Sequence, residues 1–392
     1  MNRGGLAAGL LVWAASAPVG AANIELEFMG PGYNDTTAAA PVGDNPGTTR
    51  GEQRRIATQF AADILGQRLV STIDIVIQAA FPPESCGGGP GEGFTTIGSA
   101  GPTNFFLFPP GGAPAGVTPN VFYPQALANA LANEDLDPSA EIDARFNASI
   151  DRADCLGDID WYYGLDGEPG NDISFIEVAV HEFIHGLGFL TLTNLETGAL
   201  PTRGGQPRPD VFATRIRDLS ENQLWPALTN AQRADSATND GNVVWDGPSA
   251  NSTGAPTLSD GTNQGRIQLY APDPLEDGSS VSHWDTALLP NALMEPFATA
   301  DVSALGGIGL SACVLQDIGW QLTGGAGCPD NSTTTPTPGT PGNPGAAPAS
   351  GVGGGGGGGG CALGRPGAAD PLLWLMGGLA LIGVARRRTA SR

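Results

Sequence analysis

The amino-acid sequence predicts an α+β fold, and three observations lead to it. Residues 24–28 and 73–77 read as strands, the second with isoleucine at every other position. Between them, residues 49–65 repeat apolar side chains at the spacing of a helix. A second helical repeat covers residues 174–187. Strands and helices are therefore both expected in one folded region.

The chain begins with a segment typical of a secretory signal peptide. Arg3 precedes an apolar run over residues 6–15, and small residues lead to Ala21, after which we expect cleavage. The alternative is a membrane anchor, but this run is too short to span a bilayer. Residues 1–21 therefore predict export.

The first helix has a start signal of its own. Thr49 and Glu52 are spaced as a capping box, and the stripe that we expect to be buried follows at Ile56, Phe60, Ile64 and Leu65. Residues 82–120 are rich in glycine and proline, which predicts loops around short strands at 95–97 and 105–108. Residues 123–131 are expected to be helical.

Acidic residues crowd the next segment. One interpretation is a calcium site, because hard cations take several oxygen ligands. The other is a solvated acidic loop, which the irregular spacing favours. The residues concerned are Asp151, Asp154, Asp158, Asp160, Asp166, Glu168 and Asp172.

The second predicted helix carries the strongest chemical signal. Ser174 and Glu177 are again spaced as a capping box. His181 and His185 are four residues apart, so they stack on one helix face and can bind one metal ion. Glu182 lies on the neighbouring strip, where a general base for a metal-bound water would stand. Gly188 then suits a turn out of the helix.

A third ligand is needed for a hydrolytic zinc site, and the chain has three histidines in all. The remaining one is His283. A carboxylate such as Glu196 or Glu221 is the rival third ligand, although neither lies in a recognisable helical motif. The paired histidines could also be a chance string in a buried helix.

These residues resemble a known family. Residues 181–189 read H-E-x-x-H-x-x-G-F, which resembles the metzincin zinc endopeptidases. Most metzincins place the third ligand three residues after the glycine, where this chain has Thr191. The leishmanolysin family instead inserts a long segment before a Ser/Ala-His-Trp block and a Leu-Met turn. This chain has similar blocks at residues 282–284, 293–296 and 315–320.

The resemblance implies a zinc metalloendopeptidase acting on proteins or peptides. His181, His185 and His283 would bind zinc, Glu182 would be the general base, and Met294 would form the floor of the Met-turn. It also implies a metzincin-like fold, with a twisted mixed sheet and the active-site helix in an N-terminal subdomain. The rival from another class is an adhesin or scaffold that keeps this fold without turnover.

On this basis the mature chain divides into three parts. Residues 22–190 form the N-terminal catalytic subdomain, 191–282 an insertion, and 283–330 a C-terminal subdomain with the third histidine and the Met-turn. Within the insertion we expect helices at 220–228 and 230–236 and strands at 242–245 and 266–270. A closing helix from Leu310 to Ile318 should stop at Gly319.

The C-terminal region has the composition of a linker followed by a sorting signal. Residues 331–360 are rich in threonine, proline and glycine and are expected to be a linker. Residues 361–392 begin with Cys361, continue with a short apolar run and end in an arginine cluster. This pattern resembles bacterial sorting tails that a dedicated protease removes after transient membrane contact, and Cys361 could carry a surface attachment. The alternative is a simple anchor with positive-inside arginines.

Charge limits the partners. The chain carries a formal charge of −22 and has no lysine, and residues 22–330 alone hold 12 arginines against 39 acidic residues, or −27. So negative a protein is unsuited to binding nucleic acid or an anionic membrane surface. The composition suits an exported enzyme at the cell surface or outside the cell.

Cysteine usage points the same way. Cys86, Cys155, Cys313 and Cys328 form an even set in the mature region, as expected in an oxidising compartment. Three pairings are open, and we favour Cys86 with Cys155 and Cys313 with Cys328. A latency role for Cys86 as a zinc ligand is the alternative.

Overall fold

The computed structural model describes residues 20–86, 94–299, 301–324, 327–331 and 359–364. Within them the chain has a mixed α+β fold built on one five-stranded sheet and several helices, which confirms the predicted class. The predicted signal peptide lies outside the described residues except at its last two positions, as do most of the linker and all of the tail after residue 364.

The sheet is mixed, and its strand order is β1-β2-β6-β3-β16. Its strands are β1 Ile24–Met29, β2 Ile75–Ala80, β6 Ile142–Phe146, β3 Phe94–Pro102 and β16 Gly359–Gly364. The first three run parallel to one another, and β3 is antiparallel to β6. The strand β16, from the far end of the chain, pairs antiparallel with β3.

Helix α1, Arg50–Gly66, connects β1 to β2 as the sequence predicts. Its capping box forms, because the Thr49 hydroxyl accepts the Glu52 N–H while the Glu52 carboxylate accepts the Thr49 N–H. Phe60, Ile64 and Leu65 are buried, whereas Ile56 is only half-buried. The helix therefore packs on the sheet through the later part of the predicted stripe.

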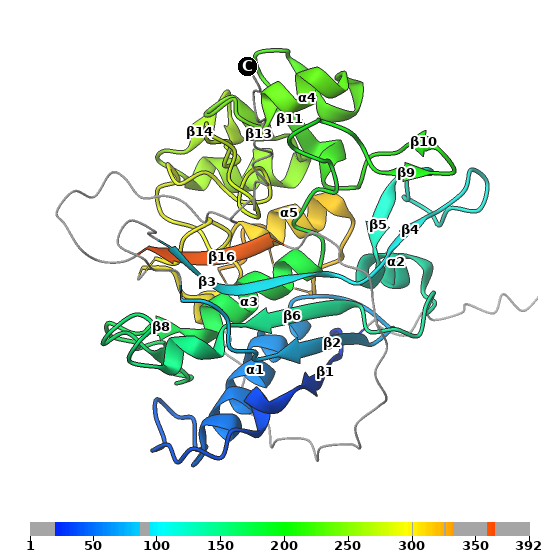
Figure 1. The fold of residues 1–392 in the computed structure, drawn as a ribbon. Helices are drawn as coiled ribbons and strands as arrows, with labels where there is room; N and C mark the ends of the chain where they lie inside the picture. The colour runs from blue at the N-terminus through cyan, green and yellow to red at the C-terminus, as the bar shows by residue number, and fades with distance from the viewer. Residues whose placement is uncertain (1–19, 87–93, 300, 325–326, 332–358, 365–392) are drawn as a thin grey trace, which may run out of the picture.

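Helices α1 and α3, Phe175–Gly186, pack against each other and lie on the same face of the sheet (Figure 1). Between α3 and the strands, Phe175 contacts Phe146 at the end of β6 and Phe81 just after β2, with ring centroids 4.8 and 5.3 Å apart. All three rings are fully buried. This aromatic core fixes the start of α3 against the sheet.

The smaller elements gather mainly beyond the β16 side of the sheet (Figure 1). They are β4 Phe105–Leu107, β5 Phe122–Pro124, α2 Gln125–Ala132, β7 Trp161–Tyr162, β8 Ile173–Ser174, β9 Thr202–Arg203, β10 Gln206–Pro207, β11 Ile216–Asp218, β12 Gln223–Leu224, α4 Asn230–Ser236, β13 Val243–Trp245, β14 Thr262–Asn263, β15 Arg266–Ile267 and α5 Ser311–Ile318. The closing helix α5 ends at Gly319, as predicted.

One predicted helix is wrong. Residues 220–228 form the short strand β12 and then a single 3-10 turn at Trp225–Ala227. The reason is local, since the Asp218 carboxylate accepts the N–H groups of Ser220 and Glu221 and so holds a turn there. The predicted helix at 230–236 and the strand near 242–245 are present, whereas the strand predicted at 266–270 ends at Ile267.

Two disulfides join Cys86 to Cys155 and Cys313 to Cys328, the pairing that we favoured. Their Cα atoms are 5.1 and 4.8 Å apart. Because Cys86 is paired, its alternative role as a zinc ligand is wrong. Two disulfides fit an extracellular protein. Among the described residues, no helix is long and apolar enough to cross a membrane.

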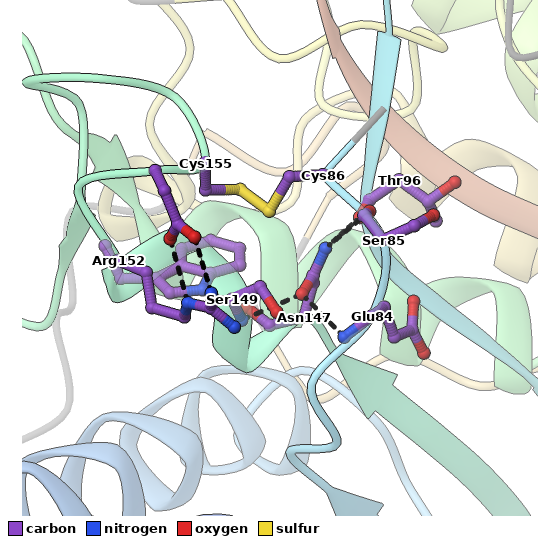
Figure 2. The surroundings of a disulfide bond; sticks show 10 residues. Glu84, Ser85, Cys86, Thr96, Asn147, Ser149, Arg152 and Cys155 are labelled. Atoms are coloured by element: carbon purple, nitrogen blue, oxygen red, sulfur yellow. Dashed lines mark hydrogen bonds and ion pairs between the residues drawn. A yellow bond between two sulfur atoms is a disulfide. The ribbon is translucent and has the colours of Figure 1, made fainter. Parts of the chain in front are cut away.

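Around the first disulfide, Asn147 holds three segments together (Figure 2). Its Nδ2 donates to the main-chain oxygens of Ser85 and Thr96, and its Oδ1 accepts the N–H groups of Glu84 and Ser149. The residues before Cys86, strand β3 and the end of β6 are thus bound together. This arrangement anchors the start of β3.

The C-terminal region differs from the sequence prediction in one respect. The predicted linker ends at residue 360, yet Gly359 and Gly360 already belong to β16, together with the first residues of the predicted tail. The pairing is explained by main-chain hydrogen bonding to a sheet edge, which does not depend on composition. The Cys361 attachment stays a prediction.

Candidate metal centre

Helix α3 begins after Ser174, as predicted, but without the capping box. The Ser174 side chain makes no capping hydrogen bond. Glu177 instead bonds to Ser303 and to the main chain of Ala304. Ser174 itself lies in β8, which pairs with β7. The tertiary contacts of the first turn have therefore replaced the local cap.

The helix ends where the sequence indicates. Gly188 has φ +121°, in the region that favours glycine, and a Cβ there would lie 2.9 Å from Ile318 Cδ1 and 3.0 Å from Pro124 Cγ. The turn at Gly188 carries Phe189 back beneath α3, where its N–H donates to the Ile184 oxygen. The main chain of Phe189 is thus brought close to His185.

The structure brings together all three histidines of the chain. The Nε2 atoms of His181 and His185 are 3.1 Å apart, and those of His181 and His283 are 3.2 Å apart. The third pair, His185 and His283, is separated by 3.1 Å. All three side chains are buried. Within the described part of the chain, they form the group of potential metal ligands.

Each imidazole is oriented from its other nitrogen. The Nδ1 atom of His181 donates to the Leu293 oxygen at 2.6 Å, that of His185 to the Phe189 oxygen at 2.7 Å, and that of His283 to the Ser279 oxygen at 2.8 Å. A carbonyl oxygen can only accept, so the proton of each neutral ring is at Nδ1. The three Nε2 lone pairs therefore converge.

Three converging acceptors cannot hydrogen-bond to one another. Protonation would relieve this only at low pH, because burial lowers the pKa of His181 to about 4 and that of His283 to about 3. Burial also lowers the pKa of His185 well below its ordinary value. At neutral pH the group is a neutral, preorganised set of three nitrogen ligands. Such a set can bind a metal ion.

His283 is positioned by the segment around Met294. The Trp284 N–H donates to the Met294 oxygen, and the Trp284 ring packs edge-on against Phe189 with centroids 5.2 Å apart. Met294 is fully buried, and its neighbour Leu293 supplies the oxygen that orients His181. The main chain of the predicted Met-turn segment therefore hydrogen-bonds both to His181 in α3 and to Trp284, the residue after His283.

Glu182 lies in the same helix, directly after His181, and its side chain is fully buried. Strand β3 passes close to it at Gly98, where a Cβ would lie 3.0 Å from both Cγ and Oε1 of Glu182. Only a residue without a side chain leaves the carboxylate undisturbed. The candidate base is thus packed between its helix and β3.

The rival third ligands lie elsewhere. Glu196 and Glu221 are exposed, and neither joins the histidine group. Thr191, where most metzincins have their third ligand, bonds through its hydroxyl to Asp210. Its N–H donates to the Ser282 hydroxyl at 3.3 Å, which links the end of α3 to the residue before His283.

The predicted calcium ligands do not gather. Asp151 pairs with Arg54 at 2.6 Å, Asp154 with Arg152, and Asp166 accepts the Tyr162 hydroxyl. In the residues that the structure describes, these acids form no three-ligand group. The solvated loop is the interpretation that this geometry favours, except at Asp151, whose side chain is buried beside Arg54.

Sequence reasoning missed the groups that orient the ligands. The oxygens of Leu293, Phe189 and Ser279 belong to the main chain and leave no signature in residue type. Gly98 lies in a segment with many glycines, so nothing marked it. Phe189, Leu293 and Ser282 lie within the quoted motifs, but their residue types did not reveal these hydrogen bonds.

Comparison with family models, with curated proteins and with solved structures found no match. The family resemblance therefore rests on the motifs alone, and the chemistry rests on the geometry of the three histidines.

Proposed function

We propose that this chain is an exported zinc endopeptidase of the leishmanolysin-like metzincin type. The observation that carries the proposal is the convergence of three neutral Nε2 atoms 3.1–3.2 Å apart beside the buried Glu182. Zinc–imidazole bonds of about 2.0–2.1 Å at tetrahedral angles separate the nitrogens by about 3.3 Å. The ligand set fits that ion.

In this proposal His181, His185 and His283 hold the metal. A zinc ion bound there would supply a water of lowered pKa and would polarise the scissile carbonyl. Glu182 takes the proton of the attacking water and passes it to the leaving amine, as a general base and then a general acid. Gly98 leaves room for this carboxylate, since a Cβ there would lie 3.0 Å from Glu182 Oε1.

Export and processing complete the proposal. The two disulfides support an oxidising destination. The signal-like residues 1–21 would direct export, and a sorting protease would act on the C-terminal tail, residues 361–392. Mass spectrometry of the protein recovered outside the cell should find both ends removed; a chain retaining both ends would contradict this part.

Glu182→Gln tests the chemical role. The variant keeps the shape of the side chain but cannot accept a proton, so it should keep its zinc and lose casein hydrolysis by about 10²–10⁴-fold. Near-normal turnover would refute the base assignment. Absence of casein hydrolysis by the zinc-loaded wild type, both full-length and with residues 359–392 removed, would favour the non-catalytic adhesin or scaffold instead.

A further inference from the structure

Strand β3 has two edges, of which β6 occupies one and leaves the other available for pairing. Its inner edge pairs with β6 from Gly98 to Pro102, and its outer edge pairs with β16. The outer pairing sets Gly359 opposite Ala100 and Cys361 opposite Gly98, with a register shift after Cys361. Without β16, β3 would be the edge strand of the sheet.

This outer edge lies beside the candidate metal centre. Gly98 is the β3 residue that approaches Glu182, and Cys361 is its register partner in β16. Neighbouring strands are about 4.8 Å apart, so an occupant of the edge lies one strand spacing from Gly98. Cα atoms of β16 also approach those of α3 within 8 Å, and Figure 1 shows β16 lying along β3 beside this helix.

An open sheet edge binds any extended chain through main-chain hydrogen bonds. The segment that occupies it here reads Gly-Gly-Cys-Ala-Leu-Gly. Because the segment belongs to the same chain, its effective concentration is of the order of millimolar. A separate peptide must compete with this tethered segment for the edge of β3.

We propose that residues 359–364 dock in cis on the edge of β3 that receives extended peptide substrates, so that tail and substrate exclude each other. The exclusion follows from the topology, because β3 has one outer edge and only one extended chain can pair with it at a time. The docking itself needs no catalysis; that the displaced chain is a substrate rests on the proposed function. Removal or displacement of the tail then opens the site.

The docking is tested in the full-length chain with Gly359→Pro/Gly360→Pro. Adjacent residues of a strand direct their N–H groups to opposite sides, so this pair removes one donor aimed at β3. Gly353→Pro/Gly354→Pro, ahead of the paired segment, is the matched control. Hydrogen exchange of the β3 amides should become about tenfold faster in the first variant only, while α1 amides stay unchanged. Equal β3 exchange in both variants would overturn the proposal.

The single substitutions Gly359→Pro and Gly360→Pro distinguish loss of pairing from misfolding. One proline falls where the N–H faces β3 and the other where it faces away, so one single variant should lose β3 protection and the other should keep it. If neither single variant loses protection, the cis pairing is wrong.

Competition for the edge is tested by binding of a labelled peptide of residues 357–366 carrying Cys361→Ser, which stands in for an incoming extended chain. It should bind the Gly359→Pro/Gly360→Pro chain about tenfold more tightly than the wild type or the control. Equal binding to all three would overturn the proposal. Because neither measurement needs turnover, loss of casein hydrolysis in every variant would contradict the proposed function and leave the docking result standing.

Discussion

The Nδ1 atom of His181 donates to the main-chain oxygen of Leu293 at 2.6 Å, which ties the first ligand of α3 to the turn that contains Met294. The same turn accepts the Trp284 N–H through Met294, next to His283. Ligands about a hundred residues apart in the sequence are therefore oriented by one short segment. Its stability should control the affinity for the metal.

Glu295 closes that turn and offers a test of this control. Its Oε1 accepts the Ala292 N–H at 2.6 Å, and burial raises the pKa of Glu295 to about 8, so the carboxyl group is neutral at pH 7. Glu295→Gln keeps the acceptor and should bind zinc like the wild type, whereas Glu295→Leu should bind it about tenfold more weakly. Competition with a chelator measures both. Equal affinities would show that the turn does not orient His181.

The pH dependence of the metal-free protein is a second test. Since burial lowers the pKa of His181 to about 4 and that of His283 to about 3, the folded state binds fewer protons than the unfolded state below about pH 6.5. Stability should therefore fall as the pH drops from about 6.5 towards 4. Imidazole resonances, which come from three histidines alone, should show no titration between pH 7 and 5. A midpoint near 6.5 would contradict the buried geometry.

Gly98→Ala tests the packing of Glu182 against β3. The new methyl group would lie 3.0 Å from Glu182 Cγ and Oε1 and 3.2 Å from Val178 Cγ1, so the carboxylate must move. We expect kcat on casein to fall about tenfold with zinc content unchanged. Ser99→Ala, at the next position of the same strand, is the control and should keep its activity. An equal kcat in both variants would show that activity does not depend on the packing of Glu182 against Gly98.

Local signals explain what the sequence could predict. The Thr49 cap, the helix around His181 and the stop at Gly188 depend on neighbouring residues, so spacing and residue type reveal them. The pairing of the four cysteines was predicted on the assumption that each disulfide stays on one side of the site.

Competing contacts explain what failed, and most of them involve residues distant in the sequence. Ser174 has the residue type of a cap, but Glu177 finds its partners at Ser303 and Ala304. The turn at Asp218 prevented the helix expected at 220–228. The pairing of β16, Gly359–Gly364, with β3, Phe94–Pro102, joins segments far apart in the sequence, and no local pattern specifies such a register.

The zinc content of the full-length chain and of His283→Ala tests the central claim most directly, with Glu196→Ala as a control on an exposed carboxylate. Three converging nitrogens predict one zinc per chain in the wild type and in the control, and a large loss in His283→Ala. Zinc fully retained by His283→Ala would mean that His283 is not the third ligand, in spite of the 3.1 Å and 3.2 Å separations that join it to the other two histidines.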